Sequence, residues 1–239
     1  MASRGEREQL SLHEEFGLLC LHDKKGTIIS EKSRLGMAGA LLAELHLQGL
    51  IRVEASQRRT LVDADPSRWV NDPVLNECLR KIRKARRRSR LAMWVLVFAY
   101  RGRLARRVAE RLCWRGILRA DDQKLLLFFS RQTFPEINSS PEQAVIERLR
   151  EAIFSDADDV SPRTMVLATL ADACDLLRPI FGRKELGPRE VRIRQLTNGQ
   201  QAGQHIVAAV NNAQRVLGVA GAAIAVATSP GIGALMERF

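Results

Sequence analysis

The residues of this sequence best suited to chemistry are arginines and lysines, and they are crowded into one stretch. The segment "RKIRKARRRSR", residues 80–90, contains eight basic residues in eleven, and the next ten residues carry no charge. Guanidinium and ammonium groups bind phosphates and other anions. The stretch therefore predicts binding to a polyanion, either nucleic acid or an anionic membrane surface.

Positive charge is concentrated in one part of the chain. The 239 residues sum to +11, whereas residues 80–119 alone hold fifteen basic residues and a single acid, Glu110. The remainder of the chain is therefore net negative. A local patch of this kind is typical of a protein with a polyanionic partner, and the plainer alternative is a solvated arginine-rich face.

Recognisable catalytic and metal-binding patterns are missing from the sequence. The four histidines have no ligand spacing, and there is no phosphate-binding G-x-x-x-x-G-K-[ST] loop. Ser11 and Glu14 match a capping box, which accounts for both residues without catalysis. We therefore expect no enzymatic activity, no catalytic residue, no metal site and no cofactor.

The cysteines and the apolar runs favour a cytoplasmic chain without a spanning helix. The four cysteines stand far apart in apolar helical contexts, as free thiols in a reducing compartment do, and no signal peptide opens the sequence. Residues 91–100 are too few for a bilayer, which needs roughly 20 apolar residues. Residues 216–236 are broken by "SPGIG" and are interpreted as a core helix with a frayed tail.

Helical patterns dominate, and two segments share a helix–glycine–hairpin pattern. Ser140-Pro141 and Ser161-Pro162 predict helix starts with a serine cap and proline at the first position. Residues 41–64 and 107–129 each run amphipathic helix, glycine, apolar pair, polar turn and apolar strand. Gly49 and Gly116 stand where a helix C-cap needs the left-handed conformation. Winged helices have this shape too, so nucleic-acid binding has to be weighed.

The basic stretch itself reads as part of a helix. From residue 74 to residue 90 the apolar positions keep helical spacing, which predicts one helix with its arginines on the outer face. Like charges would stack at i,i+4, each pair destabilising the helix by about 0.2–0.5 kcal/mol. An anionic leaflet would turn this into attraction of about 1 kcal/mol per basic residue. DNA phosphates would do the same.

The second hairpin favours a membrane over nucleic acid. Its strand contains the run Leu125, Leu126, Leu127 and Phe128, which is apolar on both faces, whereas a half-buried strand alternates apolar and polar residues. The run is either buried on both sides or inserted on one side into the lipid headgroup–acyl boundary. A DNA wing would carry basic or polar residues there, yet this turn carries two aspartates.

Seven motifs of the chain, in order, resemble the Golgi phosphoprotein 3 family. They are "LSLHEEFGLLCLHDKKGTI", "AGALLAELHLQGLI", "VEASQRRTLV", "DPVLNECL", "RGILRADDQKLLLF", "VLATLADACDLL" and "VRIRQL". The resemblance implies a mostly helical single domain with a protruding hydrophobic β-hairpin. It also implies a peripheral membrane protein that binds phosphatidylinositol 4-phosphate and, in eukaryotes, a non-enzymatic Golgi adaptor that retains glycosyltransferases.

The resemblance also implies a headgroup pocket, and here the sequence departs from the family. The positions that carry a tryptophan and an arginine in eukaryotic members are Ile29 and Ala38. The arginine pair on the helix before the hairpin is matched, one residue out of register, by Arg103 and Arg106, with Arg107 beside them. Recognition of other acidic lipids, as in a prokaryotic relative, would suit these departures.

The combined interpretation is a mainly α fold, a compact single-domain helical bundle with peripheral β-hairpins, one of them protruding and hydrophobic. Residues 9–239 form the domain and residues 1–8 a flexible N-terminus. Anionic lipid is the expected partner, contacted by the six arginines Arg103, Arg106, Arg107, Arg86, Arg87 and Arg88, with the run from Leu125 to Phe128 inserted.

Further partners and the location follow from the same interpretation. Cytosolic tails of membrane proteins, and self-association through the hairpin, stay open as further partners. The location expected is cytoplasmic and peripheral to a membrane, which in a eukaryotic cell is the cytosolic face of the Golgi. The alternative function is a nucleic-acid-binding protein built on winged-helix-like units.

Overall fold

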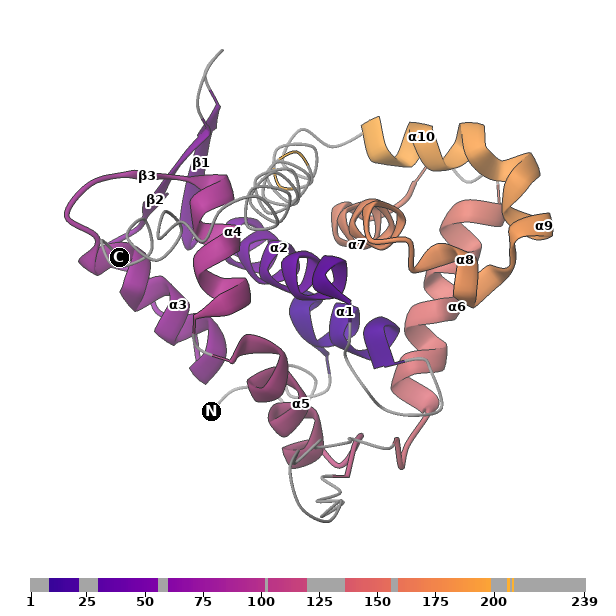
Figure 1. Cartoon of the computed structure of the whole chain (residues 1–239), viewed down its shortest axis with the longest axis horizontal. Coiled ribbons are helices and arrows are strands. Elements are labelled where there is room, and N and C mark those ends of the chain that lie inside the picture. The colour runs from indigo at the N-terminus through magenta and orange to yellow at the C-terminus, as the bar shows by residue number, and fades with distance from the viewer. Residues whose placement is uncertain are drawn as a thin grey trace, which may run out of the picture.

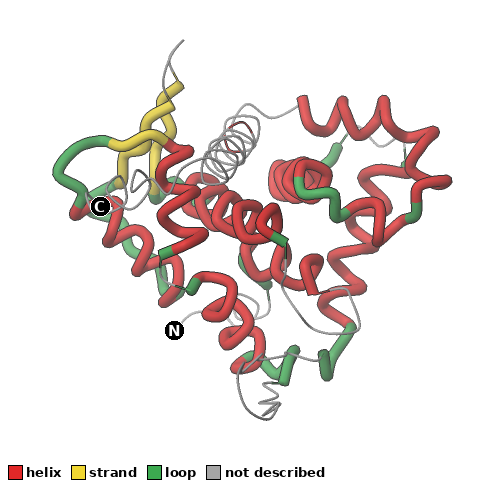
Figure 2. Tube along the Cα trace, viewed as in Figure 1, coloured by secondary structure: helices red, strands yellow, loops and turns green. Residues whose placement is uncertain are grey.

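The computed structural model describes residues 9–21, 30–55, 60–101, 103–119, 136–155 and 159–198, together with residues 206 and 208. These residues are mostly helical, with a small antiparallel sheet at one corner (Figure 1). Figure 2 shows how few of them are strand. The predicted mainly α fold with a peripheral β-hairpin is confirmed, whereas the protruding hydrophobic hairpin is not. The predicted flexible N-terminus and the apolar run from Leu125 to Phe128 lie outside the described residues.

Helix α2 (Glu31–Leu47) is the centre of the bundle (Figure 1). It packs against α1 (Leu12–Leu21), α4 (Leu91–Tyr100) and α7 (Pro162–Ala173). Every residue from Leu35 to Leu45 is buried, because helices lie on several sides of α2. A side chain at Gly36 would collide with Phe16 of α1 and with Cys174 at the end of α7, so glycine is required there.

The first predicted helix–glycine–hairpin unit is confirmed. Gly49 has φ +67°, and the N–H of Leu50 donates to the carbonyl of Leu45 (2.8 Å), which closes the end of α2. Strands β1 (Ile51–Ala55) and β2 (Thr60–Ala64) then pair antiparallel. The chain adds one further short strand to their sheet, β3 (Ser89–Arg90), which pairs with β2.

The prediction of one helix from residue 74 to residue 90 is wrong. Helix α3 (Pro73–Lys84) ends at Lys84, and Ala85 is extended with ψ 127°. Arg88 instead pairs with Glu54 of β1 (2.8 Å) and Asp63 of β2 (3.0 Å). Sheet pairing and these two carboxylates offer the arginine tract an alternative to stacking like charges along a helix.

The remaining helices form the rest of the bundle, and their predicted caps have mixed outcomes. They are α5 (Leu104–Trp114), α6 (Ser140–Phe154), α8 (Leu177–Phe181), α9 (Arg183–Leu186) and α10 (Glu190–Asn198), with a 3₁₀ turn at Gly187–Arg189. The hydroxyl of Ser161 caps α7 by accepting the N–H of Thr164 (3.2 Å), as predicted. Ser140 does not cap α6, because it is already helical and its N–H donates to Asn138 (3.2 Å).

The uncharged run Leu91–Tyr100 is α4, a core helix. Val95, Leu91 and Phe98 are almost fully buried, and α4 packs on α2 and α5. None of the described helices has the length and the hydropathy of a membrane span.

A network of buried ion pairs joins α1, α2, α5, α6 and α7. Its carboxylates, Glu14, Glu15, Glu44 and Asp72, are almost fully buried. Glu14 pairs with Arg115 (3.0 Å) and Arg111 (3.3 Å) of α5, and Asp72 with Arg111 (3.1 Å). Glu15 pairs with Arg148 (2.9 Å) and Arg163 (3.4 Å), and Arg163 also holds Glu44 (2.9 Å). Glu14 also accepts the N–H of Ser11 (2.8 Å), which is one half of the predicted capping box.

Removing one charge from this network should cost far more stability than removing an exposed one. We expect Glu14→Gln to lower the free energy of unfolding by about 3 kcal/mol, since it leaves Arg111 and Arg115 facing a neutral amide. Glu110→Gln is the matched control, because it breaks an exposed pair with Arg106 on the same helix and should cost at most about 1 kcal/mol. Urea unfolding measures both, and equal losses would contradict the structural role of the network.

His13 gives the fold a specific dependence on pH. The side chain is fully buried, and neither ring nitrogen has a hydrogen-bond partner among the described residues. Burial lowers the pKa of His13 below its ordinary 6.5, as does Arg111, while Asp72, Glu14 and Glu44 oppose the shift. The folded protein therefore keeps His13 neutral at a pH where the unfolded chain binds a proton.

Stability should fall as the pH drops below 6.5, the ordinary pKa of histidine. Unfolded chains bind more protons than folded ones in that range, so acid favours unfolding. His13→Leu removes this contribution, and its free energy of unfolding should depend less on pH there, with the two proteins running parallel above about pH 7.5. Urea unfolding at a series of pH values is the measurement. If the wild type and His13→Leu lose the same free energy of unfolding at acid pH, His13 is not the group responsible.

Candidate functional site

Helix α5 positions the three arginines that the resemblance assigned to the headgroup. Arg103 precedes the helix in a left-handed conformation (φ 52°, ψ 42°), and Arg106 and Arg107 lie in its first turn. Arg107 joins α5 to α3, because its guanidinium pairs with Glu77 (2.7 Å). Burial opposes ionisation of Glu77, but Lys81 and Arg107 outweigh it and lower the pKa of this carboxyl.

These three arginines differ in how freely they can bind a ligand. Arg103 is exposed and has no ion pair with another described residue. Arg106 is exposed too, yet its Nε donates to Glu110 (2.7 Å). Arg107 is only 26% exposed and is held by Glu77. Of the three, Arg103 is the side chain most available to an anion.

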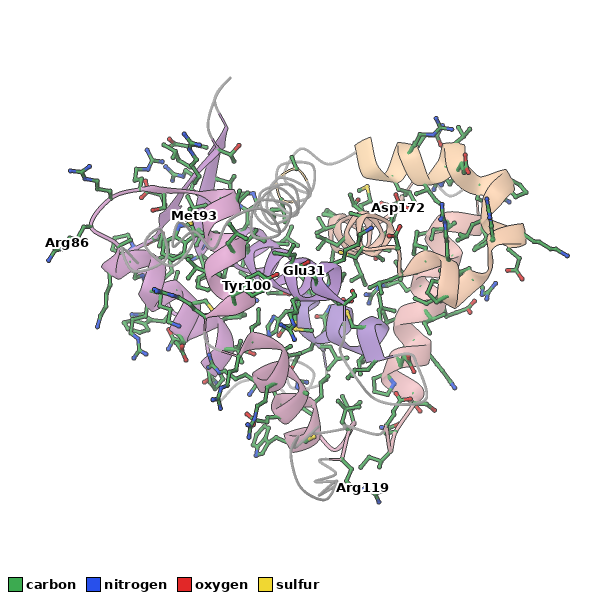
Figure 3. All side chains as sticks on the ribbon, in the orientation of Figure 1. Glu31, Arg86, Met93, Tyr100, Arg119 and Asp172 are labelled. Atoms are coloured by element: carbon green, nitrogen blue, oxygen red, sulfur yellow. The ribbon has the colours of Figure 1, made fainter. Side chains whose placement is uncertain are left out.

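The second arginine group lies in the turn after α3. Arg86 and Arg87 are exposed, and neither has an ion pair within the described part of the chain. Arg88 is bound to the sheet through Glu54 and Asp63. Figure 3 shows Arg86 at the outer edge of the molecule, where its side chain points away from the body.

The described residues on either side of the segment that contains the apolar run come together after the C-terminal end of α5. Gly116 (φ +72°) closes the helix as Gly49 closes α2, with the N–H of Ile117 donating to Leu112 (3.0 Å). Leu118 then forms an antiparallel bridge to Glu136, and the N–H of Ile137 donates to Ile117 (3.0 Å). Residues 117–118 and 136–137 thus run side by side, as the base of a hairpin would.

The two predicted arginine groups and this base follow one edge of the molecule. Arg86 stands at one end of the edge and Arg119 at the other, with α3 and α5 between them (Figures 1 and 3). The arginine tract and the base of the apolar segment are therefore not neighbours. Leu125 to Phe128 are outside the described residues.

Comparison with known proteins identifies the family. A family model described as Golgi phosphoprotein 3 (GPP34) matches residues 12–215, which is most of the chain. This chain belongs to the Golgi phosphoprotein 3 family. The comparison with curated proteins gave no match. Family membership is consistent with a lipid-binding adaptor in general and with a protein that is not an enzyme.

The position that carries the pocket arginine in eukaryotic Golgi phosphoprotein 3 relatives is closed here. Ala38 is fully buried in the middle of α2. It offers no charge, and no path from solvent reaches it. Ile29, the other departing position, lies outside the described residues. That this half of the family pocket is absent stays a prediction.

A cavity that the sequence analysis did not identify lies between α1, α2, α3, α5 and α7. Its volume is about 930 Å³, and its charged lining consists of Glu44, Asp72, Arg111, Arg115 and Arg163. These arginines are the ones that pair with the buried carboxylates, so the cavity carries little net charge. Trp114 also lines it, and its place between Arg111 and Arg115, which lie one helical turn apart, is the feature of the sequence that could have indicated the cavity.

The described residues offer little for catalysis. They contain no cluster of three or more histidine, cysteine or acidic side chains able to hold a metal ion. Burial raises the pKa of Cys78 and of Cys174 to about 12, so these thiols are protonated at neutral pH. All four cysteines are free, as predicted.

Proposed function

We propose that this member of the Golgi phosphoprotein 3 family is a peripheral membrane protein that binds anionic lipid headgroups and acts as an adaptor without catalytic activity. The headgroup is a phosphoinositide, such as phosphatidylinositol 4-phosphate, or another acidic phospholipid. The observation that carries the proposal is the set of exposed arginines without a described carboxylate partner, at Arg86, Arg87 and Arg103, along one edge of the molecule. Family membership supports it independently.

The arginines have different roles in lipid binding. Arg86 and Arg87 supply long-range attraction, because each basic residue near an acidic leaflet contributes about 1 kcal/mol. Arg103 contacts headgroup phosphate directly. Arg106 joins it by leaving Glu110, since an exposed ion pair is worth at most about 1 kcal/mol. Arg107 and Arg88 hold the scaffold through their carboxylates and contribute mainly charge.

Insertion of Leu125, Leu126, Leu127 and Phe128 supplies the apolar part of the attachment. The antiparallel bridge between Leu118 and Glu136 supports this proposal, because it pairs the two ends of the segment as the base of a hairpin would. A charged patch and one apolar element together suit reversible attachment.

Selectivity should rest on charge more than on headgroup shape. Ala38 cannot provide the guanidinium that would grip one phosphate in a defined geometry. Acidic phospholipids should therefore bind nearly as well as a monophosphorylated phosphoinositide of the same total charge. Cytosolic tails of membrane proteins are the proposed clients, self-association through the hairpin is a further mode, and the cytoplasmic face of a membrane, the Golgi in a eukaryote, is the proposed location.

Charge reversal at the free arginines should abolish vesicle binding. For Arg86→Glu with Arg87→Glu we expect sedimentation with acidic liposomes to weaken by roughly a thousandfold at low salt, from about 1 kcal/mol per unit of charge changed. Arg183→Glu with Lys184→Glu is the matched control. It makes the same change of charge on exposed residues of α9, on the far side of the molecule (Figure 1), and should bind nearly as wild type. Equal loss in both would mean that only net charge matters.

A mobility-shift assay beside the vesicle assay separates lipid binding from nucleic-acid binding. A mobility-shift series with duplex DNA should show weak binding that disappears steeply with salt, as for any basic surface. Specific, salt-resistant DNA binding together with no vesicle binding would overturn the proposed function in favour of the winged-helix alternative.

A further inference from the structure

Two of the three tryptophans are exposed to an extent that folding does not explain. Trp114 is 82% exposed and Trp69 is 72% exposed, whereas Trp94 is buried at 3%. Indole rings are large and apolar, so a water-facing tryptophan forgoes the burial that this side chain offers. Trp69 and Trp114 are therefore candidates for contact with something outside the chain.

Each exposed indole is held against an arginine. The guanidinium of Arg83 lies 5.2 Å from the ring centre of Trp69, and that of Arg111 lies 5.9 Å from the ring centre of Trp114. Both arginines are fixed by other contacts. Arg83 donates to the carbonyls of Asp65 and Arg68, and Arg111 pairs with Glu14 and Asp72. The two rings are thus positioned before any partner binds.

Trp114 lines the cavity described above, and Trp69 directly precedes a segment that also lines it. This segment runs from Val70 to Pro73. The ion pair between Asp72 and Arg111 ties it to α5. Trp69 and its neighbours lead into α3, and Trp114 ends α5, the helix that Arg103 precedes and the bridge at Leu118 follows.

We propose that Trp69 and Trp114 are interfacial anchors that lie in the headgroup layer of an anionic bilayer and fix the α3–α5 edge against it. This inference rests on the proposed function and adds to it the orientation of the protein on the membrane. Tryptophan prefers the membrane–water interface, where its apolar ring and its polar N–H are both accommodated. The exposed arginines of the same edge, Arg86, Arg87 and Arg103, match the charge of acidic headgroups, which selects a lipid surface over an uncharged apolar partner.

Tryptophan emission of the full-length protein tests the proposal directly. Vesicles of phosphatidylcholine with phosphatidylserine are compared with vesicles of the same composition that carry brominated acyl chains. Bromine quenches only rings near the bilayer, and Trp94 is buried in the core, so Trp69 and Trp114 provide the signal. We expect the brominated vesicles to lower the emission of the wild-type protein.

Single substitutions then assign the quenching and the affinity. Trp69→Ser and Trp114→Ser should each remove part of the quenching and weaken vesicle partitioning on the order of tenfold. Val191→Ser is the matched control, because Val191 is 61% exposed on α10, away from the α3–α5 edge, and should bind as wild type.

Three outcomes would count against the proposal. Vesicle binding without quenching, or with both tryptophan variants unchanged, would overturn the anchors and leave the proposed function intact. Reduced self-association of Trp114→Ser in sedimentation velocity, with unchanged vesicle binding, would assign the ring to a second copy instead. Absence of vesicle binding by the wild-type protein would overturn both proposals.

Discussion

The structure depends on how four buried carboxylates are neutralised. Glu14 and Glu15 of α1, Glu44 of α2 and Asp72 before α3 have lost their water, so each needs a guanidinium within reach. The arginines come from α5, α6 and α7, which ties those helices to the central pair. One consequence concerns function. Four arginines pair with these buried carboxylates, namely Arg111, Arg115, Arg148 and Arg163. They are therefore not available to an anionic partner, unlike the exposed basic residues of this sequence.

Arginines of two kinds lie on or beside helix α5: some pair with a buried carboxylate, and others are exposed to solvent. Its inward face carries Arg111 and Arg115 to Glu14, and these pairs place the helix beside α1. Its first turn carries Arg106 outward and sets Arg103 in solvent. Its end, closed by Gly116, carries the base of the segment that contains the apolar run. The same pairs that hold the bundle together thus also fix the positions of Arg103 and of the bridge at Leu118.

Local signals in the sequence predicted local structure well, and failed where distant residues decide. Gly49, Gly116 and Ser161 end or begin helices as expected, because each requirement is met within a few residues. The continuous basic helix was wrong because Arg88 finds Glu54 and Asp63, on strands whose approach depends on the tertiary fold. The candidate site divides in the same way. Exposure of Arg86 was expected from the pattern of the basic tract, and Arg103 was named from the family resemblance, whereas capture of Arg107 by Glu77 needs α3 and α5 to be neighbours.

Both helix–glycine–hairpin units end their helix with a glycine of positive φ, but the strand sequences that follow differ. In the first hairpin Val62 is buried while its neighbour Asp63, and Glu54 on the facing strand, are exposed, so one face packs on the bundle and the other is solvated. The solvated face carries the carboxylates that pair with Arg88, and β3 pairs with β2 to complete a small sheet. The run from Leu125 to Phe128 has no such alternation. A strand with two apolar faces requires a cover on each. In the function proposed above an anionic membrane supplies one of these covers, which agrees with the exposed cations at Arg86, Arg87 and Arg103.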